Sequence, residues 1–487
     1  MPAAIDEKVL DEKLAALETA RAWSPRLISK LEALLRHEDD FALFKINPIK
    51  FAAEKGVSEA EAIDLFLHAT NAGLFTMNWH LLCPSCGDAV KSFASLGGVH
   101  TKLYCSLCHV DTFAQLDDYI EVSFVVSGQV RAISAHHPET LTADDYYFRY
   151  RFSENARFPD GVKFTERYRS FLKHLSYLEP GETRRLDLDV TPGWFVAHDL
   201  MRETGSLFAV AGAAHAGRKE LTIEAGEAYS PVEGELTPGA YSVTVRGAVG
   251  RRGSLMIGCF PSELDDRVTL AFDPFLSGKR LLTTQTFRDL FRSENLVGTE
   301  GIGIKDLTLL FTDLKGSTAL YERIGDLKAF SLVQQHFDCL GRAVSGNSGA
   351  VVKTIGDAVM ASFLNPVDAV KAALVMLEEI EKFNAQQGAR DIILKIGVHK
   401  GPLIAVNLNE RLDYFGQTVN IAARVQGIAD ADEICVTEDV YSYPGVAALL
   451  GETAPVSEGT FLKGVAREMR VRRMLFKPGA AHPEARR

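Results

Sequence analysis

The chain has 487 residues, enough for two to four domains of ordinary size. Hydrophobic residues make up 46% of the sequence and charged residues 24%, which is typical of soluble proteins with sizeable cores. The net charge of −11 argues against general nucleic-acid binding, which depends on clustered Lys and Arg. No apolar run approaches the ~20 residues needed to cross a bilayer, and the N-terminus, MPAAIDEKVLDEKL, is too charged for a signal peptide. We therefore expect a cytoplasmic protein without membrane contact.

The first eighty residues have a helical pattern. Apolar residues recur at helical spacing over 6–37, and Ser24-Pro25 predicts a break followed by a new helix. Residues 47–79 predict a helix, a turn at GVS, a second helix and a strand-like tail, an order that resembles a winged helix-turn-helix. The second helix carries EAEAID where a DNA-reading helix is usually basic. We interpret 1–80 as a packing or partner module, with nucleic acid disfavoured as its ligand.

Four of the seven cysteines form two CxxC pairs, CPSC and CSLC, with eighteen residues between the pairs. This spacing predicts a four-cysteine zinc site within a zinc ribbon over 81–117. Four thiolates leave no open coordination position, so one structural zinc ion per chain is expected. A redox dithiol pair and unliganded thiols are the alternatives. The candidate ligands are Cys83, Cys86, Cys105 and Cys108, and the isolated cysteines, expected in cores, are Cys259, Cys339 and Cys435.

Short β-rich runs separated by Pro, Gly and Asp turns fill 118–275, with one helical interruption near FTERYRSFLKHL. The pattern predicts an antiparallel β-sandwich, a regulatory domain whose ligand the sequence does not name. Four histidines in this region lack metal spacing and are interpreted as ordinary core and surface residues: His136, His137, His198 and His215. In the linker 276–305, TFRDLFRSENL predicts a short amphipathic helix and GTEGIG a turning connection. By position, this linker is the expected transmitter between the two halves.

Three stretches in the last third carry polar residues at fixed places: LTLLFTDLKGST (307–318), VVKTIGDAVMASF (351–363) and LDYFGQTVNIAARV (412–425). Taken singly, Asp313 suits a strand end or a helix cap, Asp357 suits a tight turn, and Lys353 suits a solvated strand. In combination, two aspartates at the ends of adjacent strands supply the hard oxygen ligands that magnesium prefers. Asn420 and Arg424, four residues apart, share one helix face that can hold a sugar and a phosphate. The combination predicts nucleotide chemistry with magnesium.

Together these stretches resemble the catalytic motifs of the class III adenylate and guanylate cyclases, over residues 306–478. The resemblance implies a ferredoxin-like α/β domain, a sheet with helices on one face, within a multidomain α+β protein. The apolar pattern agrees with that fold. The expected elements are a strand at 307–312, a helix at 318–342, a hairpin at 350–363, a helix at 366–385, strands near 392–406, a helix at 418–428 and a last strand at 469–475.

The resemblance also implies a role for each motif residue. Asp313 and Asp357, with the backbone carbonyl of Leu314, would hold two magnesium or manganese ions per active site. Asn420 would orient the ribose and Arg424 would meet the charge that develops on the α-phosphate. Lys463, in FLKGVAR, matches a lysine that binds the terminal phosphates. The implied reaction converts ATP to 3′,5′-cyclic AMP and pyrophosphate.

Base choice falls to two positions in this family, here Lys353 and Asp413. The lysine can donate to adenine N1 and the aspartate can accept from the adenine 6-amino group, whereas family members that use GTP typically carry Glu and Cys there. An unpaired buried polar group costs about 1–3 kcal/mol, so this pair favours ATP. One position departs from the family pattern, because HKGPLIA has Pro402 where some members place a phosphate-facing arginine. We expect Lys400 or Lys463 to compensate.

The sequence therefore predicts a soluble adenylate cyclase that is regulated by its N-terminal half through an unknown ligand or protein. The resemblance implies a head-to-tail homodimer, in which Asp313 and Asp357 of one subunit face the base and phosphate residues of the other. A guanylate cyclase is the nearer alternative, and Lys353 and Asp413 disfavour it. The more distant alternative is a zinc-ribbon and winged-helix regulator with a nucleotide-sensing cyclase-like domain, which the complete catalytic set disfavours.

Overall fold

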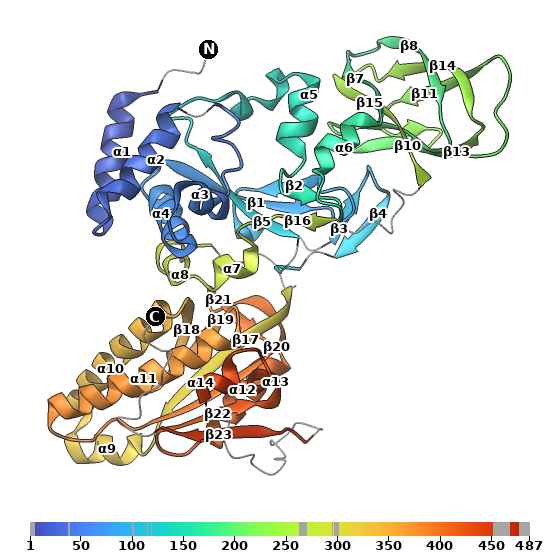
Figure 1. The fold of residues 1–487 in the computed structure, drawn as a ribbon. Helices are drawn as coiled ribbons and strands as arrows, with labels where there is room; N and C mark the ends of the chain where they lie inside the picture. Colours follow the sequence, from blue (N-terminus) through green and yellow to red (C-terminus); the bar gives the residue numbers. More distant parts are fainter. Residues whose placement is uncertain are drawn as a thin grey trace. The chain divides into compact units, whose positions relative to one another are not determined.

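The computed structural model describes residues 5–37, 39–99, 102–113, 115–117, 119–262, 270–294, 296, 301–450 and 468–476. The chain divides into two compact units, and Figure 1 shows their elements. Unit 1 comprises Met1–Ala94, His100–Ala114 and Tyr119–Leu276, and unit 2 comprises Ser95–Val99, Gln115–Asp118 and Ser277–Arg487. Among the helices in these described ranges, none has the length and apolar character to cross a membrane.

Unit 1 begins with four helices. The break between the first two falls at Ser24-Pro25, and the next two follow local capping rules. Asn47 caps the third helix ahead of a proline, and Ser58 with Glu61 forms a capping box at the fourth, which fixes the turn between them. The helices are α1 (Glu7–Ala20), α2 (Pro25–His37), α3 (Pro48–Lys55) and α4 (Glu59–Asn71).

A three-stranded sheet of order β2-β1-β5 follows the helices. Its strands are β1 (Phe75–Leu82), β2 (Ala89–Phe93) and β5 (Ile120–Val126). The sequence analysis grouped the last of these with the 118–275 sandwich, and this assignment was wrong, because β5 pairs antiparallel with β1 along its whole length. All seven residues of β5 are buried, so the strand has no alternation that could reveal which sheet it joins. The hairpin β3 (Lys102–Cys105) and β4 (Val110–Phe113) lies between β2 and β5 in sequence.

Two larger sheets share one apolar core further along unit 1. The five-stranded sheet has the order β13-β10-β9-β15-β7 and the four-stranded sheet the order β12-β11-β14-β8. The expectation of purely antiparallel pairing was wrong for two pairs, because β10 with β13 and β11 with β14 run parallel. The strands are β7 (Leu172–Leu178), β8 (Thr183–Val190), β9 (Gly193–Asp199), β10 (Thr204–Val210), β11 (Arg218–Ala225), β12 (Tyr229–Ser230), β13 (Glu233–Leu236), β14 (Gly239–Gly247) and β15 (Gly253–Phe260).

The five-stranded sheet is covered on both faces. In β9, Phe195 and Ala197 belong to the core shared with the four-stranded sheet, so by strand alternation Trp194 and Val196 face the other way. All eight residues of β15 are buried, as expected for a strand with both faces covered. Short elements connect the sheets of unit 1: η2 (Ser134–His136), η3 (Pro138–Thr140), α5 (Ala143–Asp145), the π-helix η4 (Tyr146–Arg151), β6 (Ala156–Arg157), α6 (Phe164–Ser170) and β16 (Ala271–Phe272).

Unit 2 contains a mixed sheet of order β18-β19-β17-β20-β22-β23, with β21 paired to β20. Neighbouring strands are antiparallel except β20 and β22, which run parallel. Its strands are β17 (Ile302–Leu314), β18 (Gly349–Ile355), β19 (Ala358–Phe363), β20 (Leu394–Leu408), β21 (Arg411–Phe415), β22 (Glu433–Thr437) and β23 (Val471–Leu475). Its helical elements are η1 (Leu96–Gly98), α7 (Gly278–Leu282), α8 (Gln285–Leu290), α9 (Ser317–Ile324), α10 (Asp326–Gly346), α11 (Pro366–Gln387), α12 (Gln417–Gly427), α13 (Glu438–Tyr441) and α14 (Val446–Leu450).

Helices lie on both faces of this sheet, so the expectation of helices on one face alone was wrong. The long helices α10 and α11 pack on the face that includes Ile396 and Val398 of β20. The residue between them, Gly397, points to the opposite face, where a Cβ would lie 2.2 Å from the backbone nitrogen of Gln426. Helix α12 approaches β20 this closely only because Gly397 has no side chain. The single helix expected at 318–342 is also two helices, which meet at Gly325 with φ 80°.

Candidate active site

The two motif aspartates lie at the same end of neighbouring strands. Asp313 is the penultimate residue of β17, and Asp357 lies in the turn that joins β18 to β19. The pairing of Phe311 with Met360 runs toward that turn. The buried Thr312 hydroxyl accepts a hydrogen bond from the Val359 backbone nitrogen at 3.1 Å, which ties the turn to the end of β17. The local fold therefore brings both carboxylates to the same end of these neighbouring strands, as the motif predicted. We call this end of the sheet, with Asp313 and Asp357, the aspartate edge.

The electrostatics of this edge suit a divalent cation. The Oδ2 atom of Asp357 is buried and makes no hydrogen bond within the described residues. Asp313 Oδ2 lies 2.6 Å from Lys395 Nζ, an ion pair. Burial and the negative charges of Asp357 and Asp313 raise the pKa of the Tyr321 hydroxyl. A buried carboxylate oxygen without a donor is unfavourable, and hard oxygen donors are the ligands of magnesium and manganese, so these residues fit such an ion.

Lys395 is a residue that the sequence analysis missed. It is the direct cross-strand neighbour of Asp313 in the antiparallel β17–β20 pair, and its side chain is mostly buried. Seventy-nine residues lie between β17 and β20 in the sequence, so no local pattern indicates that the two side chains meet. Leu314, whose carbonyl the resemblance implied as a further metal ligand, is a buried residue paired with Leu394 at the same strand end.

The two positions implied in base choice meet in the fold. Lys353 Nζ, from β18, donates a hydrogen bond to Asp413 Oδ2, from β21. The Asp413 side chain is only 9% exposed, and its other oxygen accepts from the Tyr414 backbone nitrogen at 2.8 Å. The Lys353 side chain is 38% exposed. A donor therefore stands beside a positioned acceptor at a partly open surface.

Helix α8 contacts the strands on both sides of this ion pair. Gln285 Oε1 accepts from the Val351 backbone nitrogen at 2.7 Å, where the β18–β19 register shifts. The Arg288 guanidinium donates to the Leu412 carbonyl at 3.1 Å and lies 5.3 Å from the ring centroid of Tyr414. The sequence predicted a short helix here but gave no sign of these contacts, which join a linker to distant strands.

The ribose and phosphate candidates lie on the solvent-facing side of α12. Asn420 is exposed and Arg424 is half-buried, one helical turn apart, so the shared face predicted from their spacing is present. The side chains of Ile421 and Val425 are buried in a small apolar cluster and anchor the helix. Helix α12 therefore presents an amide and a guanidinium on one surface.

The Pro402 departure has a structural reason. Pro402 lies in β20 between residues paired with Leu307 and Ile304, where β17 has an irregular register and the missing N–H is tolerated. Its carbonyl accepts a hydrogen bond from Thr418 of α12. Lys400, one of the two expected compensating residues, is paired with Asp306 at 2.9 Å. The other, Lys463, lies outside the described residues.

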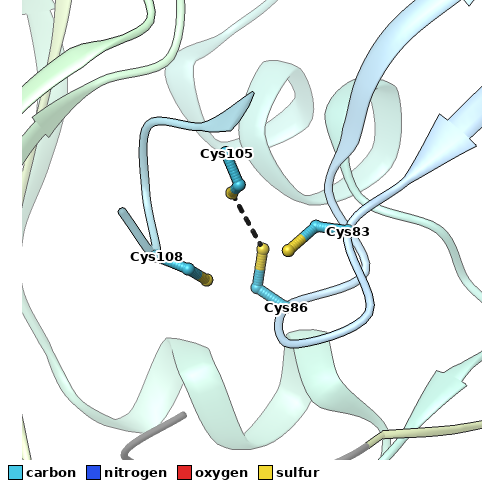
Figure 2. A group of neighbouring side chains, drawn as sticks. All are labelled: Cys83, Cys86, Cys105 and Cys108. Atoms are coloured by element: carbon cyan, nitrogen blue, oxygen red, sulfur yellow. Dashed lines mark hydrogen bonds between the residues drawn. The ribbon is translucent and has the colours of Figure 1, made fainter. Parts of the chain in front are cut away.

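The four cysteines of the CxxC pairs converge in unit 1. Figure 2 shows their sulfur atoms pointing toward one another, and all four lie within 4.8 Å of each other. Cys86 Sγ is 3.6 Å from Cys105 Sγ, and burial raises the pKa of the Cys86 thiol. The cluster predicted from spacing is present, with an arrangement that could hold one metal ion. The remaining three cysteines are buried in apolar clusters, as predicted: Cys259, Cys339 and Cys435.

Comparison with known protein families identifies both parts of the chain. Residues 10–289 match the "Family of unknown function (DUF5939)", a match that spans more than half of the 487 residues. The chain belongs to the DUF5939 family. Residues 302–452 match the "Adenylate and Guanylate cyclase catalytic domain". The C-terminal part of this DUF5939 protein is therefore a class III cyclase catalytic domain, as the three motifs predicted.

Relatives of the cyclase domain include enzymes named for either nucleotide. An adenylate cyclase of Anabaena cylindrica is 32% identical over 149 residues, which are 28% of this chain and 30% of that protein. Guanylate cyclase 32E of Drosophila melanogaster is 26% identical over 171 residues, 32% of this chain and 14% of that protein. The crystal structure of the adenylyl cyclase CyaB from P. aeruginosa aligns with 37% of this chain and 99% of that chain, at 20% identity and a TM-score of 0.33. The DUF5939 chain thus spans less than a third of the length of the Anabaena and Drosophila relatives.

Proposed function

We propose that this protein is an adenylate cyclase, which converts ATP to 3′,5′-cyclic AMP and pyrophosphate. The observation that carries the proposal is the Lys353–Asp413 pair, held at the surface of a cyclase domain that keeps both motif aspartates. Adenine presents an acceptor, N1, beside a donor, the 6-amino group, and a lysine beside a carboxylate complements that edge. Guanine presents the opposite polarity and would leave both side chains unpaired, at a cost of about 1–3 kcal/mol each.

The ion pair must open when a base enters. Lys353 is more than a third exposed, so its side chain has room to move, and an entering adenine would offer N1 to the lysine and its 6-amino group to the aspartate in exchange for the ion pair. Asp413 would remain in place, because its other oxygen is held by the Tyr414 backbone nitrogen. We infer that the lysine moves to the base while the aspartate serves as the fixed acceptor.

Asp313 and Asp357, with the Leu314 carbonyl, are the proposed ligands of two magnesium or manganese ions. Such ions, when bound, would lower the pKa of the ribose 3′-hydroxyl and neutralise the triphosphate. Asn420 would orient the ribose so that its 3′-oxygen faces the α-phosphorus. Arg424 would donate to the α-phosphate oxygens as their charge grows, a role suited to a permanently charged planar group. Lys463 is proposed to bind the terminal phosphates.

We further propose that the active form is a head-to-tail homodimer. The aspartates of one subunit would face Lys353, Asp413, Asn420 and Arg424 of its partner, which gives two equivalent sites. Exposed large apolar side chains in the cyclase unit are candidates for such an interface, and two of them, Leu327 and Phe330, lie one helical turn apart on α10. Those that are at least half exposed include Leu327, Phe330, Ile355 and Phe415.

For the rest of the chain we propose a regulatory role in a soluble, cytoplasmic enzyme. The proposed parts are a winged-helix-like region at 1–80, a zinc ribbon at 81–117, a β-sandwich within 118–275 that excludes β5, a transducer at 276–305 and the cyclase domain at 306–478. The contacts of Gln285 and Arg288 with strands β18 and β21 support the transducer assignment.

The direct test is to incubate the purified full-length protein with ATP or GTP in the presence of magnesium or manganese. We expect cyclic AMP and pyrophosphate in equal amounts, and a kcat/KM for ATP at least about tenfold above that for GTP, since one lost hydrogen-bond match is worth about 1–3 kcal/mol. Preferential formation of cyclic GMP would contradict the base assignment and leave the cyclase assignment intact. Absence of either product with both metals would contradict the cyclase activity.

A double substitution tests the base assignment by itself. Lys353→Glu with Asp413→Cys should lower ATP turnover and increase GTP turnover, because the polarity that faces the base is reversed. Each single substitution should mainly lose activity, since one side chain then opposes either base. The measurement is the ratio of kcat/KM for ATP and GTP in all four proteins. An unchanged ratio in a double variant that still turns over would show that these residues do not read the base.

The four-cysteine cluster predicts bound zinc. About one zinc ion per chain should co-purify with reduced protein, and Cys83→Ala or Cys105→Ala should remove it and lower the melting temperature of unit 1, because a structural site contributes to folding stability directly. Cys339→Ala is the matched control, since Cys339 is buried in the apolar core of the cyclase unit and is not a member of the four-cysteine cluster. Elemental analysis measures the metal. Equal zinc in the Cys83 and Cys339 variants would exclude the cluster as its site.

A further inference from the structure

Unit 1 contains a cavity of about 320 Å³ against the covered outer face of the five-stranded sheet. Four sheet residues form one wall, namely Trp194 and Val196 of β9, Leu207 of β10 and Phe260 of β15. Helix α6 forms a second wall with Phe164 and Tyr168. The third wall consists of the two turns that carry the cysteine pairs, whose four cysteines are drawn in Figure 2.

This space is too large for a packing defect. Protein interiors contain few voids larger than a water molecule, because each lost contact costs dispersion energy. A volume of about 320 Å³ lies at the lower end of ligand pockets, which start near 300 Å³. The surrounding strands are apolar on both faces, so the sequence supplies apolar side chains where a water-filled groove would call for polar ones.

The lining specifies the chemistry of the occupant. Five of the thirteen lining residues are aromatic, and no Lys, Arg, Asp or Glu side chain is among them. Flat aromatic walls favour flat aromatic ligands, since ring faces and edges then pair. Because no lining side chain carries a positive charge, an anionic ligand would lose its hydration without gaining an ion pair. The cysteine-bearing turns contribute the polar side chains of Ser85 and His109. The Tyr168 hydroxyl, on the α6 wall, already donates to the Met256 sulfur at 3.8 Å.

We propose that this cavity is a binding site for a small, uncharged aromatic molecule with a hydrogen-bonding group at one end. The aromatic body lies between α6 and the five-stranded sheet, and its polar end meets Ser85 and His109. The site is independent of the proposed cyclase chemistry, because every lining residue belongs to unit 1.

The four-cysteine cluster shapes one wall of this site. Ser106, inside the second CxxC pair, lies 3.0 Å by its hydroxyl from Nε2 of the buried His198 on β9. Burial lowers the pKa of His198 to about 3, so the ring is neutral and its bond to Ser106 is unaffected by ordinary changes in pH. Gly87, beside the first pair, packs so closely that a Cβ would lie 2.6 Å from the Ala156 Cβ. The second turn is thus fixed to β9 and the first to β6, so we expect occupancy of the cavity to depend on an intact cluster.

The test uses the neutral dye N-phenyl-1-naphthylamine, which fluoresces in apolar surroundings, and the full-length protein. We expect saturable binding of about one dye per chain. Leu207→Trp and Val110→Trp, which fill the space from opposite walls, should weaken binding at least about tenfold. Leu221→Trp is the matched control, because Leu221 is equally half-buried but packs on the core between the two sheets. It should bind the dye as the wild type does.

A second readout does not depend on the stability of the filled variants. Trp194 borders the cavity, so Trp194→Phe should reduce energy transfer from tryptophan to bound dye more than Trp23→Phe, which alters a residue of the N-terminal helical region. The proposal is overturned if the wild type shows no saturable binding. It is equally overturned if the two cavity variants bind like Leu221→Trp, or if the Trp194 and Trp23 variants lose energy transfer equally, since the dye then binds elsewhere.

Discussion

Asp313→Asn or Asp357→Asn should lower cyclic nucleotide production by at least about a thousandfold. Each change removes a negative charge while it preserves side-chain volume, and a metal carboxylate supplies several kcal/mol of charge stabilisation, at about 1.4 kcal/mol per tenfold in rate. We expect the larger loss for Asp357, whose Oδ2 is buried without a hydrogen-bond partner among the described residues. Because no protein donor stabilises the charge of this oxygen, a bound metal ion would be its main partner. The measurement is kcat/KM with saturating magnesium and again with manganese.

The control for this experiment is Asp338→Asn. Asp338 is exposed on α10 in the same unit. Its substitution is the same chemical change at a position outside the aspartate edge, so turnover should stay near the wild-type value. Circular dichroism should show all three variants folded, since neither motif aspartate belongs to the apolar core. Near wild-type turnover in either motif variant would mean that the metal ligands lie elsewhere.

Mixing two inactive variants should restore activity. A subunit with Asp313→Ala keeps a sound Arg424 face, and a subunit with Arg424→Ala keeps sound metal ligands. The head-to-tail arrangement then gives each heterodimer one intact site and one doubly altered site, so activity should return to at most about half the wild-type level per heterodimer. The measurement is cyclic nucleotide production after subunit exchange, with exchange itself followed by fluorescence.

A second mixture serves as the control for this complementation. Asp313→Ala and Asp357→Ala alter the same edge, so their heterodimers contain one defective edge in every site and should stay inactive. If exchange is demonstrated and the Asp313 and Arg424 variants also stay inactive together, each chain completes its own site. Recovery in both mixtures would mean that the carboxylates act independently of each other.

The sequence predicted the features that depend on local spacing. The cysteine cluster follows from two CxxC turns, and the positions of Asp313 and Asp357 follow from strand ends, since each motif carries its own strand or turn. Asn420 and Arg424 share a helix face because a fixed rise and twist place residues four apart together. Contacts between segments that lie far apart in the chain could not be predicted from the sequence. Neither the Asp313–Lys395 ion pair nor the α8 contacts leave a local pattern.

Strands that are buried on both faces lack the sequence pattern that would assign them to a sheet. A strand with one solvent-exposed face alternates polar and apolar residues, and that alternation indicates which face is buried and in which register the strand pairs. Strands β5 and β15 are buried along their whole length, so their sequences show a strand but not its neighbours. The same effect hid the position of α12, where the only trace is Gly397, a single glycine in an apolar strand.

Helix α8 is only six residues long, yet it holds strands on both sides of the Lys353–Asp413 pair. A shift of α8 would therefore displace both strands, and with them the Lys353 donor on β18 and the Asp413 acceptor on β21. Under the proposed function, a signal that arrives through the linker would change the ATP-to-GTP ratio along with the rate. A signal that acted on the aspartate edge alone would change the rate and leave the ratio constant. If the N-terminal half regulates the cyclase domain as proposed, substrate selectivity measured at different activation states would therefore distinguish these two routes.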